Sequence, residues 1–393
     1  MPMIGSTDRA RALGRAFERH YGHEPRLVAR APGRVNLIGD HTDYNGGFVF
    51  PAAIDLETLV AARPGHEDIA VWSVQFEQSD AFGPPPARIE HHGGWQGYVR
   101  GVVSVAAEAG LPVAPCELMI AGDVPLGSGL SSSAALEVAV LEALDALFGW
   151  RLPPVRLALL AQRAENTFVG VACGVMDPMV SALGKRDHAL FIDCRSLETE
   201  AVPLHLEAIG VQIAVLDSGV PRTLATAGYN QRRQECEEGL AVLATHLDRP
   251  LGSLRDVDRR EFEALRVELP PLLGARLGHV FSENDRVLLA RRALATGDVT
   301  TFGRLMNESH ASLRDDYEVS CAELDTLVEL CGSEPGVLGA RLTGAGFGGS
   351  AVALATAAAD LDRALARYQE QTGRPARMWR LAAADGAALL PLD

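Results

Sequence analysis

Hydrophobic positions along the chain follow a helical period in some segments and a strand-like period in others. Apolar residues that recur every three or four positions predict helices, and short apolar runs bounded by Gly and Pro predict strands. The expected helices span residues 8–22, 95–108, 134–148, 155–168 and 227–246, with further charged helices within 255–330. The expected strands span residues 26–31, 48–54, 57–62, 69–76, 116–120, 189–193 and 211–216. Because strands and helices do not alternate strictly, the pattern indicates a mixed α+β fold rather than a Rossmann fold or a TIM barrel.

Two of these helices are expected to be amphipathic. In the helix over 134–148, the acidic residues Glu137, Glu142 and Asp145 occupy one side, and such a polar side normally faces water. The opposite side of that helix carries Leu136, Val140, Leu144 and Leu147. The helix over 155–168 presents one apolar face made of Leu157, Leu160, Ala161, Ala164 and Phe168.

The length and the charge of the chain limit what it can be. A chain of 393 residues exceeds the size at which a single core usually keeps growing, so two domains are expected. The pattern changes near 195–210, and we therefore expect domains over 1–200 and 201–393. The net charge of −15 argues against nucleic acid or an anionic membrane as a partner, since both attract basic surfaces.

The cysteines and the apolar runs indicate a cytoplasmic protein. The 6 cysteines form no C-x-x-C pair and no Cys/His cluster with zinc-site spacing, which fits a reducing compartment. Residues 1–8 contain no apolar core of a signal peptide. No apolar run approaches the roughly 18 residues of a membrane helix.

A loop rich in Gly and Ser, Gly127-Ser-Gly-Leu-Ser-Ser-Ser133, lies between an expected strand and a long expected helix. Glycines let a backbone approach a ligand closely, and a helix start offers unpaired N–H groups and a positive dipole end. Together these favour a phosphate, and a serine could coordinate a Mg²⁺ that a nucleotide brings. A serine that simply caps the helix is an alternative that the loop alone leaves open.

Residues 33–47 crowd charged and polar side chains among four glycines: Arg34, Asp40, His41, Asp43 and Asn45. A carboxylate in such a loop can accept hydrogen bonds from two sugar hydroxyls, and a misplaced hydroxyl leaves buried groups unpaired. The composition therefore suits sugar recognition. A solvated turn with Asx caps is the alternative.

Segment 33–47 resembles the galactokinase signature nearly residue for residue. Residues 125–134 resemble the ATP-binding motif of the GHMP kinases, and residues 343–350 resemble their third motif. The matches run in family order from residue 30 to residue 350. The resemblance implies a two-domain α+β GHMP kinase fold with the active site between the domains. It also implies ATP, Mg²⁺ and phosphorylation of the anomeric hydroxyl of D-galactose, and we expect a monomer or a weak homodimer.

The same resemblance assigns roles to individual residues. Asp177 would be the catalytic base, and Arg34 would keep it ionised and stabilise charge on the transferring phosphoryl group. The sugar would be bound by Asp40, His41, Thr42, Asp43 and Tyr229. The nucleotide would be bound by Gly127, Ser128, Gly129, Leu130, Ser131, Ser132 and Ser133, with Ser73 and Trp95 as further candidates. Mg²⁺ would be held by Ser133 and Glu165.

Each of these residues also has a plainer local interpretation. Asp177-Pro178 is typical of an N-cap followed by a proline at the first helical position. Glu165 is typical of the surface of an amphipathic helix, and Tyr229 of packing.

Two positions depart from the family pattern: galactokinases usually carry Glu where this chain has Asp40, and Gln where it has Pro178. The shorter Asp40 side chain withdraws its carboxylate by about one C–C bond. In the family this position faces the hydroxyl on carbon 6 of the sugar. We therefore hypothesise a slightly roomier pocket around carbon 6.

Three other functions stay open. The chain could be a GHMP kinase for another aldose, a uronic acid or an amino sugar. It could be a galactose sensor that binds sugar and ATP without catalysis, although such relatives lack a Ser-Ala pair like Ser133-Ala134. It could be an NAD enzyme built on Gly344–Gly349, although these glycines depart from the G-x-G-x-x-G spacing.

Overall fold

The computed structural model describes residues 5–87, 89–221 and 225–392, and their strands form two sheets. The larger sheet has 8 strands: β1 (Leu27–Ile38), β2 (Phe48–Pro64), β3 (Ile69–Ser73), β4 (Gln78–Phe82), β5 (Cys116–Gly122), β6 (His188–Asp193), β7 (Thr199–Pro203) and β12 (Ala388–Leu390). The smaller sheet has 4: β8 (Val211–Asp217), β9 (Val337–Thr343), β10 (Ser350–Thr356) and β11 (Arg377–Leu381). This mixed helix-and-sheet architecture confirms the expected α+β class.

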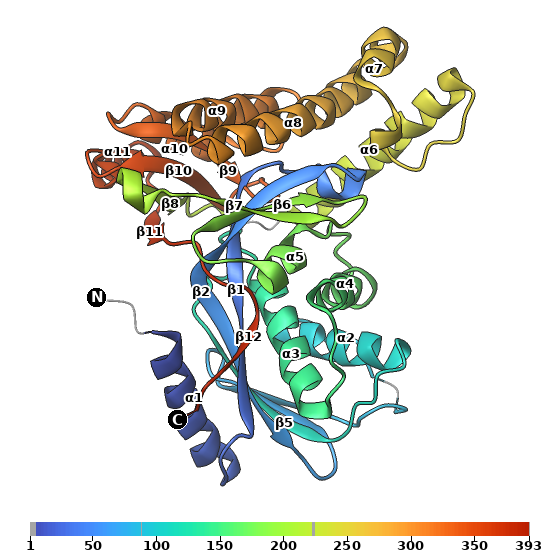
Figure 1. Cartoon of the computed structure of the whole chain (residues 1–393), viewed down its shortest axis with the longest axis vertical. Helices are drawn as coiled ribbons and strands as arrows, with labels where there is room; N and C mark the ends of the chain where they lie inside the picture. Colours follow the sequence, from blue (N-terminus) through green and yellow to red (C-terminus); the bar gives the residue numbers. More distant parts are fainter. Residues whose placement is uncertain (1–4, 88, 222–224, 393) are drawn as a thin grey trace.

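Helices cover both sheets. The first part of the chain contributes α1 (Ser6–Tyr21), α2 (Trp95–Glu108), α3 (Ser132–Phe148), α4 (Pro154–Ala164) and α5 (Met176–Leu183). The second part contributes α6 (Ala225–Leu247), α7 (Arg259–Leu265), α8 (Pro271–Ala295), α9 (Val299–Asp315), α10 (Ala322–Gly332) and α11 (Leu361–Thr372). Figure 1 shows α2 to α5 beside the long strands of the larger sheet in the lower half, and α8 to α11 around the smaller sheet at the top.

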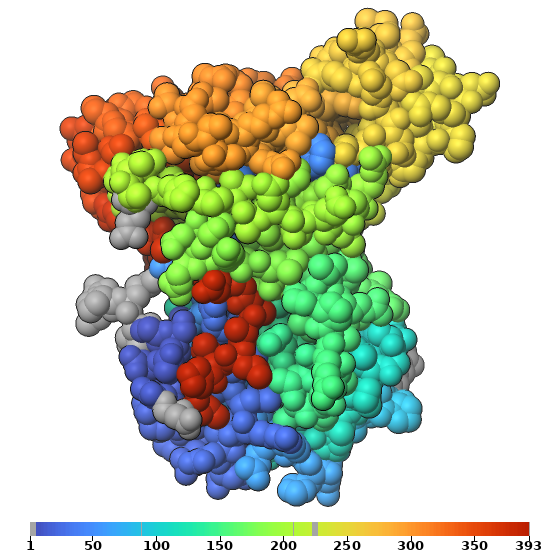
Figure 2. Space-filling view, viewed as in Figure 1, coloured from blue at the N-terminus to red at the C-terminus, as the bar shows by residue number. Residues whose placement is uncertain are grey.

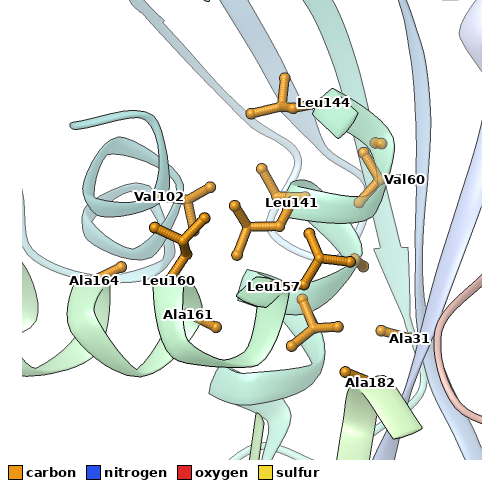
Figure 3. Close-up of a cluster of buried hydrophobic side chains, with 14 of the residues drawn as sticks. Ala31, Val60, Val102, Leu141, Leu144, Leu157, Leu160, Ala161, Ala164 and Ala182 are labelled. Carbon is orange, nitrogen blue, oxygen red and sulfur yellow. The ribbon is translucent and has the colours of Figure 1, made fainter. Parts of the chain in front are cut away.

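The strongly periodic helices are confirmed. The predictions over 8–22, 95–108, 134–148 and 227–246 match α1, α2, α3 and α6 to within two residues at each end. The helix over 155–168 is α4 followed by a π-helical turn, Glu165–Val169. Figure 3 shows its apolar face, where Leu157 and Leu160 lie beside Leu141 of α3 in the hydrophobic core.

The burial of α3 differs from the prediction. Glu137, expected on the polar side of the helix, is only 1% exposed. The prediction was wrong because α3 is covered on more than one side: it packs against the larger sheet, and α2, α4 and α5 also contact it. A helix covered in this way has no single polar stripe, so an acidic residue can be buried with the apolar ones.

The strand boundaries near the N-terminus were also predicted wrongly. Pro32-Gly33 was expected to end a strand, but β1 runs through both residues and pairs with β2 on either side. The register of this pair shifts between Pro32 and Arg34, so a β-bulge accommodates the proline and the glycine. The two strands expected over 48–54 and 57–62 are the single long strand β2.

The smaller sheet has the strand order β11-β8-β10-β9, and all of its neighbouring strands are antiparallel. Residues 344–349 connect β9 to β10 as a hairpin. A dinucleotide-binding glycine loop instead joins a strand to a helix. The structure therefore excludes the NAD-enzyme interpretation of these glycines.

The C-terminal segment returns to the larger sheet, where β12 pairs with β1. Figure 2 shows this last segment lying across the N-terminal part of the molecule. The division into domains at residues 200 and 201 stays a prediction. Within the described residues, every helix is too short or too polar to cross a membrane.

Candidate active site

A cavity of about 340 Å³ lies where the motifs from both halves of the chain meet. Arg34 of β1 and Asp177 of α5 line it together with the serines at the start of α3. Tyr229 of α6 and the β9–β10 loop, through Gly344 and Ala345, line its other side. Segments more than 300 residues apart in the sequence thus form one site.

Asp177 is held by two side chains. The guanidinium of Arg34 donates from Nε to Oδ1 at 2.7 Å and from Nη2 to Oδ2 at 2.6 Å. The Ser131 hydroxyl donates to Oδ2 as well. Asp177 is the second residue of α5, whose N-cap is Val175. The interpretation of Asp177 as an N-cap was therefore wrong, because Arg34 and Ser131 engage its carboxylate.

The β-bulge brings Arg34 to this position. A Cβ on Gly33 would lie 2.7 Å from the carbonyl oxygen of Leu130. Only glycine therefore allows the loop over residues 127–133 to approach β1 so closely. The Arg34 N–H donates to that same oxygen at 3.0 Å. Its Nη1 donates to the carbonyl oxygen of Gly129. Backbone contacts thus join β1 to the loop before α3.

Three residues of the loop before α3 adopt left-handed backbone conformations, as a loop that approaches a ligand closely requires. Gly127 and Gly129 have φ of 74° and 86°, and Ser131 has φ of 60°, all in the left-handed region. Ser131 is the N-cap of α3, but its side chain makes no capping hydrogen bond. A serine that simply caps the helix is therefore the wrong interpretation.

The loop residues do not all face the cavity. Gly127, Gly129, Ser131, Ser132 and Ser133 line it. The buried Ser128 hydroxyl instead donates to the Pro125 carbonyl at 2.8 Å, and Leu130 packs in the hydrophobic core. Only the backbone of these two residues remains for contact with a ligand.

A second cavity, of about 250 Å³, adjoins the first. Ser73 and Trp95, the two further nucleotide candidates, both line it. Tyr98, Ser132 and Ser133 line both cavities and therefore mark their junction. Tyr98 was not predicted, because one tyrosine in a regular helical pattern is indistinguishable from a packing residue.

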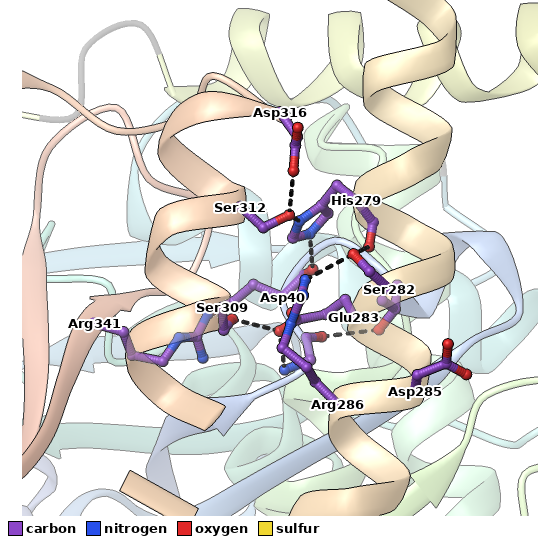
Figure 4. A network of polar contacts seen from close by, with 12 residues as sticks. Asp40, His279, Ser282, Glu283, Asp285, Arg286, Ser309, Ser312, Asp316 and Arg341 are labelled. Carbon is purple, nitrogen blue, oxygen red and sulfur yellow. Dashed lines mark hydrogen bonds and ion pairs between the residues drawn. The ribbon is translucent and has the colours of Figure 1, made fainter. Parts of the chain in front are cut away.

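Asp40 lies at the cavity wall and forms an ion pair with Arg341. The two side chains are 2% and 0% exposed. Burial raises the pKa of Asp40, and the Arg341 charge opposes that rise. Figure 4 shows the surrounding polar network of α8 and α9, in which His279 Nε2 donates to the Asp40 carbonyl at 3.2 Å.

His41 contributes a neutral ring to the cavity. Its Nε2 donates to the Ala345 carbonyl at 3.2 Å, and its Nδ1 accepts from the Tyr44 hydroxyl at 2.9 Å. Burial lowers the pKa of His41 to about 3. Both ring nitrogens are thus already engaged by the protein.

Asp43 and Tyr229 lie close together around Gly174. The Gly174 N–H donates to the Tyr229 hydroxyl at 3.3 Å, and a Cβ on Gly174 would overlap the Asp43 carboxylate. Burial and, next, the charge of Asp177 raise the pKa of Asp43 to about 7. Thr42 is fully buried, and its hydroxyl contacts the Gly39 and Phe48 carbonyls within its own loop.

Glu165 is a buried carboxylate at the cavity and not a surface residue. It begins the π-helical turn after α4, an irregularity that is frequent at functional sites. Burial and then the charge of Asp177 raise the pKa of Glu165 to about 7. Its Oε2 accepts a hydrogen bond from the Cys173 thiol at 3.4 Å.

The charges of the site fit a divalent cation. Glu165, Asp43 and Asp177 line the first cavity, where Arg34 is the one cationic side chain among the described residues. No cluster of three or more His, Cys, Asp or Glu side chains suited to a metal occurs in the part of the chain that is described. Mg²⁺ does not need such a cluster, because it takes one or two protein oxygens and completes its coordination with water and phosphate. Ser133 and Glu165 can supply those oxygens.

The chain matches three family models. The galactokinase galactose-binding signature matches residues 15–64, the N-terminal domain of the GHMP kinases matches 97–185, and the C-terminal GHMP kinase model matches 290–372.

Two curated relatives and two solved structures extend this similarity. The chain is 48% identical over 381 residues to the galactokinase of Roseiflexus sp. (strain RS-1), which covers 95% of both chains. It is 50% identical over 343 residues to that of Chloroflexus aurantiacus, covering 87% of both. The structure of Lactococcus lactis galactokinase complexed with galactose superposes with a TM-score of 0.89 at 37% identity, over 96% of this chain and 98% of that one. Methanococcus jannaschii mevalonate kinase, with a TM-score of 0.63 at 15% identity over 91% and 98% of the two chains, shares the fold alone.

The identities, their coverage and the three motifs in order lead to one conclusion: this chain belongs to the galactokinase family within the GHMP kinases, a family of sugar kinases.

Proposed function

We propose that this protein transfers the γ-phosphoryl group of ATP to the anomeric hydroxyl of D-galactose, giving α-D-galactose 1-phosphate and ADP. The observation that carries the proposal is the position of Asp177. Its carboxylate lines the first cavity and is oriented by Arg34 and Ser131. The similarity to galactokinases along nearly the whole chain supports the choice of substrates.

In this proposal Asp177 is the base. It accepts the proton of the anomeric hydroxyl while the new O–P bond forms and the bond to the ADP oxygen breaks. Arg34 holds the carboxylate in orientation through its paired hydrogen bonds and adds positive charge beside the transferring phosphoryl group. Such a reaction depends chiefly on positioning and charge, which matches a rigid site formed by short polar contacts.

The two adjoining cavities suggest how ATP is bound. The second cavity, with Ser73 and Trp95, would take the nucleoside. The phosphates would then pass the junction at Ser133 and follow the loop from Gly127 to the first cavity. Ser133 and Glu165 would hold Mg²⁺, which neutralises phosphate charge when bound.

Sugar recognition would come from the loop at 33–47 and from α6. Asp43 offers a carboxylate that can accept from two hydroxyls, and Tyr229 offers a ring wall beside it. His41 would contribute ring surface rather than hydrogen bonds, since both of its nitrogens are engaged. Asp40 would accept from a hydroxyl while it remains paired with Arg341. Thr42 would act indirectly, by fixing the loop.

Asp40 favours a second candidate function, that of a kinase for another aldose or for a uronic acid. The ion pair with Arg341 directs the short carboxylate toward the protein, which favours a roomier pocket at that end of the sugar. A non-catalytic sensor of galactose and ATP is less well supported, because Asp177 and Arg34 are both present and paired.

An ADP-release assay over a panel of aldoses tests the proposal. D-Galactose should give the highest kcat/KM, with arabinose, amino sugars and uronic acids below it. A higher value for one of those sugars would contradict the assignment of galactose as the substrate.

Comparison of wild type and Asp40→Glu on galactose and on 6-modified galactose tests the pocket around carbon 6. An unchanged ratio of the two kcat/KM values would refute the roomier pocket.

The remaining expectations belong to the same proposal. A cytoplasmic location, a monomeric or weakly dimeric state, and the lack of nucleic-acid and membrane partners suit an acidic sugar kinase.

A further inference from the structure

Glu137 of α3 is a buried carboxylate that the proposed chemistry does not use. It is 1% exposed, and neither Oε1 nor Oε2 has a hydrogen-bond partner among the described residues. An isolated carboxylate is costly to bury, so such a group calls for a partner that the protein chain does not itself provide.

Glu137 lies on the same face of α3 as Ser133, a residue at the junction of the two cavities. It lies four residues after Ser133 in the same helix, and residues spaced in this way are neighbours on one helix face. Ser133 lines both cavities. Glu137 is therefore directly behind the serine that would contact Mg²⁺.

The electrostatic effects on pKa values indicate that Glu137 lies near Glu165. Burial and then the charge of Glu165 raise the pKa of Glu137. Burial, Glu165 and Glu137, in that order, also raise the pKa of Tyr98 and of Cys173, both of which line the first cavity. Glu165 and Glu137 thus both raise the pKa values of side chains in the same part of the first cavity.

Among the described residues that line the first cavity, carboxylates outnumber cationic side chains. Within the described residues, Arg34 is the one cationic side chain of the first cavity, and its guanidinium is engaged by Asp177. A triphosphate would add further negative charge. Mg²⁺ supplies the opposite charge and keeps several of its waters, each of which can donate hydrogen bonds.

We propose that Glu137 accepts hydrogen bonds from water bound to the Mg²⁺ ion and so positions that ion against Ser133 and Glu165. The inference rests on the proposed function in that it takes a magnesium–nucleotide complex as the ligand. Glu137 is a positioning residue in this scheme, since water separates it from the metal. Partners of metal ligands that act in this indirect way often determine the affinity for the ion.

Magnesium titrations of wild type, Glu137→Gln and Glu142→Gln test the proposal. Glu142 is the matched control, because it lies on the same helix but five residues beyond Glu137 and nine beyond Ser133. With saturating ADP and no sugar, the thermal midpoint is followed as Mg²⁺ is added. For E137Q, the Mg²⁺ concentration that gives half of the stabilisation should rise roughly ten- to a hundredfold, and for E142Q it should not change. Displacement of Mn²⁺, followed by its paramagnetic resonance signal, should give the same shift.

A purely structural role for Glu137 predicts a different result. E137Q would then change the thermal midpoint without metal and nucleotide but would need the same Mg²⁺ concentration as wild type, which would overturn the proposal. If E137Q does not fold, E137D is measured instead, and an unchanged Mg²⁺ requirement overturns the proposal there too. Because these titrations contain no sugar, failure of the wild type to phosphorylate galactose would contradict the proposed function without altering their outcome.

Discussion

Arg34 and Asp177, 143 residues apart in the sequence, are joined by two parallel hydrogen bonds of 2.7 and 2.6 Å. A planar guanidinium that pairs with both oxygens of a carboxylate fixes its orientation as well as its charge. The Arg34 side chain is 5% exposed and that of Asp177 is 27% exposed. The carboxylate is thus held rigidly from the protein side while it remains accessible from the cavity.

Replacement of Arg34 by lysine should separate charge from geometry. Lysine keeps the positive charge but cannot form the paired hydrogen bonds. We expect kcat to fall roughly a hundred- to a thousandfold, the usual effect of losing one donor that stabilises a transition state, with a smaller change in KM for the sugar. Steady-state ADP release measures both parameters. Arg63→Lys, at an exposed position of β2, is the control, and equal kcat values for the two variants would contradict the role of Arg34.

Gly33→Ala should displace the loop over residues 127–133. The added Cβ would lie 2.7 Å from the Leu130 carbonyl, so the loop must move away from β1. We expect KM for ATP to rise and kcat to fall, because Arg34 also loses its contacts with the loop. Gly14→Ala in α1 is the matched control, since its new Cβ meets its neighbours at 3.5 Å, an ordinary contact distance. Unchanged kinetics in Gly33→Ala would show that the close approach is not required.

The motifs and the periodic helices could be predicted from the sequence because their signals are local. The helix over 95–108 has the predicted bounds, and Gly22 ends α1 in a left-handed conformation as expected of a C-cap glycine. The glycine and serine residues before α3 likewise predicted a loop that approaches a ligand.

Other features depend on partners that are distant in the sequence. Strand β1 continues through Pro32-Gly33 because β2 pairs with it on both sides of the bulge. The local pattern at Asp177 is typical of an N-cap, and nothing near it in the sequence indicates its contact with Arg34, which only the family resemblance implied. Glu137 was expected at the surface because α2, α4 and α5, which help to cover α3, do not enter a helical-wheel argument.

The Asp40–Arg341 pair should stabilise the fold as well as shape the pocket. Asp40→Asn leaves the buried guanidinium of Arg341 without its anionic partner, a change that typically costs about 3–5 kcal/mol. Urea denaturation of the ligand-free protein measures this cost. Asp362→Asn removes a partner of Arg380 in an exposed pair and should have little effect. Equal destabilisation by the two substitutions would contradict the importance of the buried pair.

Galactose affinity should depend on pH through Asp43. Burial and then the charge of Asp177 raise its pKa to about 7, so the ionised fraction of this carboxyl group falls as the pH drops through neutrality. Because the ionised form is the better acceptor of sugar hydroxyls, affinity should weaken as the pH falls from 8 to 6, by up to roughly tenfold per unit below the pKa.

Calorimetric titration with galactose, without nucleotide, measures this dependence. Asp43→Asn should bind the sugar weakly at every pH and show no such trend. A wild-type affinity that stays constant between pH 6 and 8 would exclude Asp43 as an ionised sugar ligand.

The most direct measurement is the galactose-dependent release of ADP by Asp177→Asn. Asparagine keeps the size of the side chain but cannot take the proton, so activity should fall to near background while circular dichroism shows an intact fold. Tight binding of galactose and of ADP by the same variant would confirm that the cavities are preserved. Full retained activity in a folded Asp177→Asn protein would contradict the assignment of Asp177 as the base.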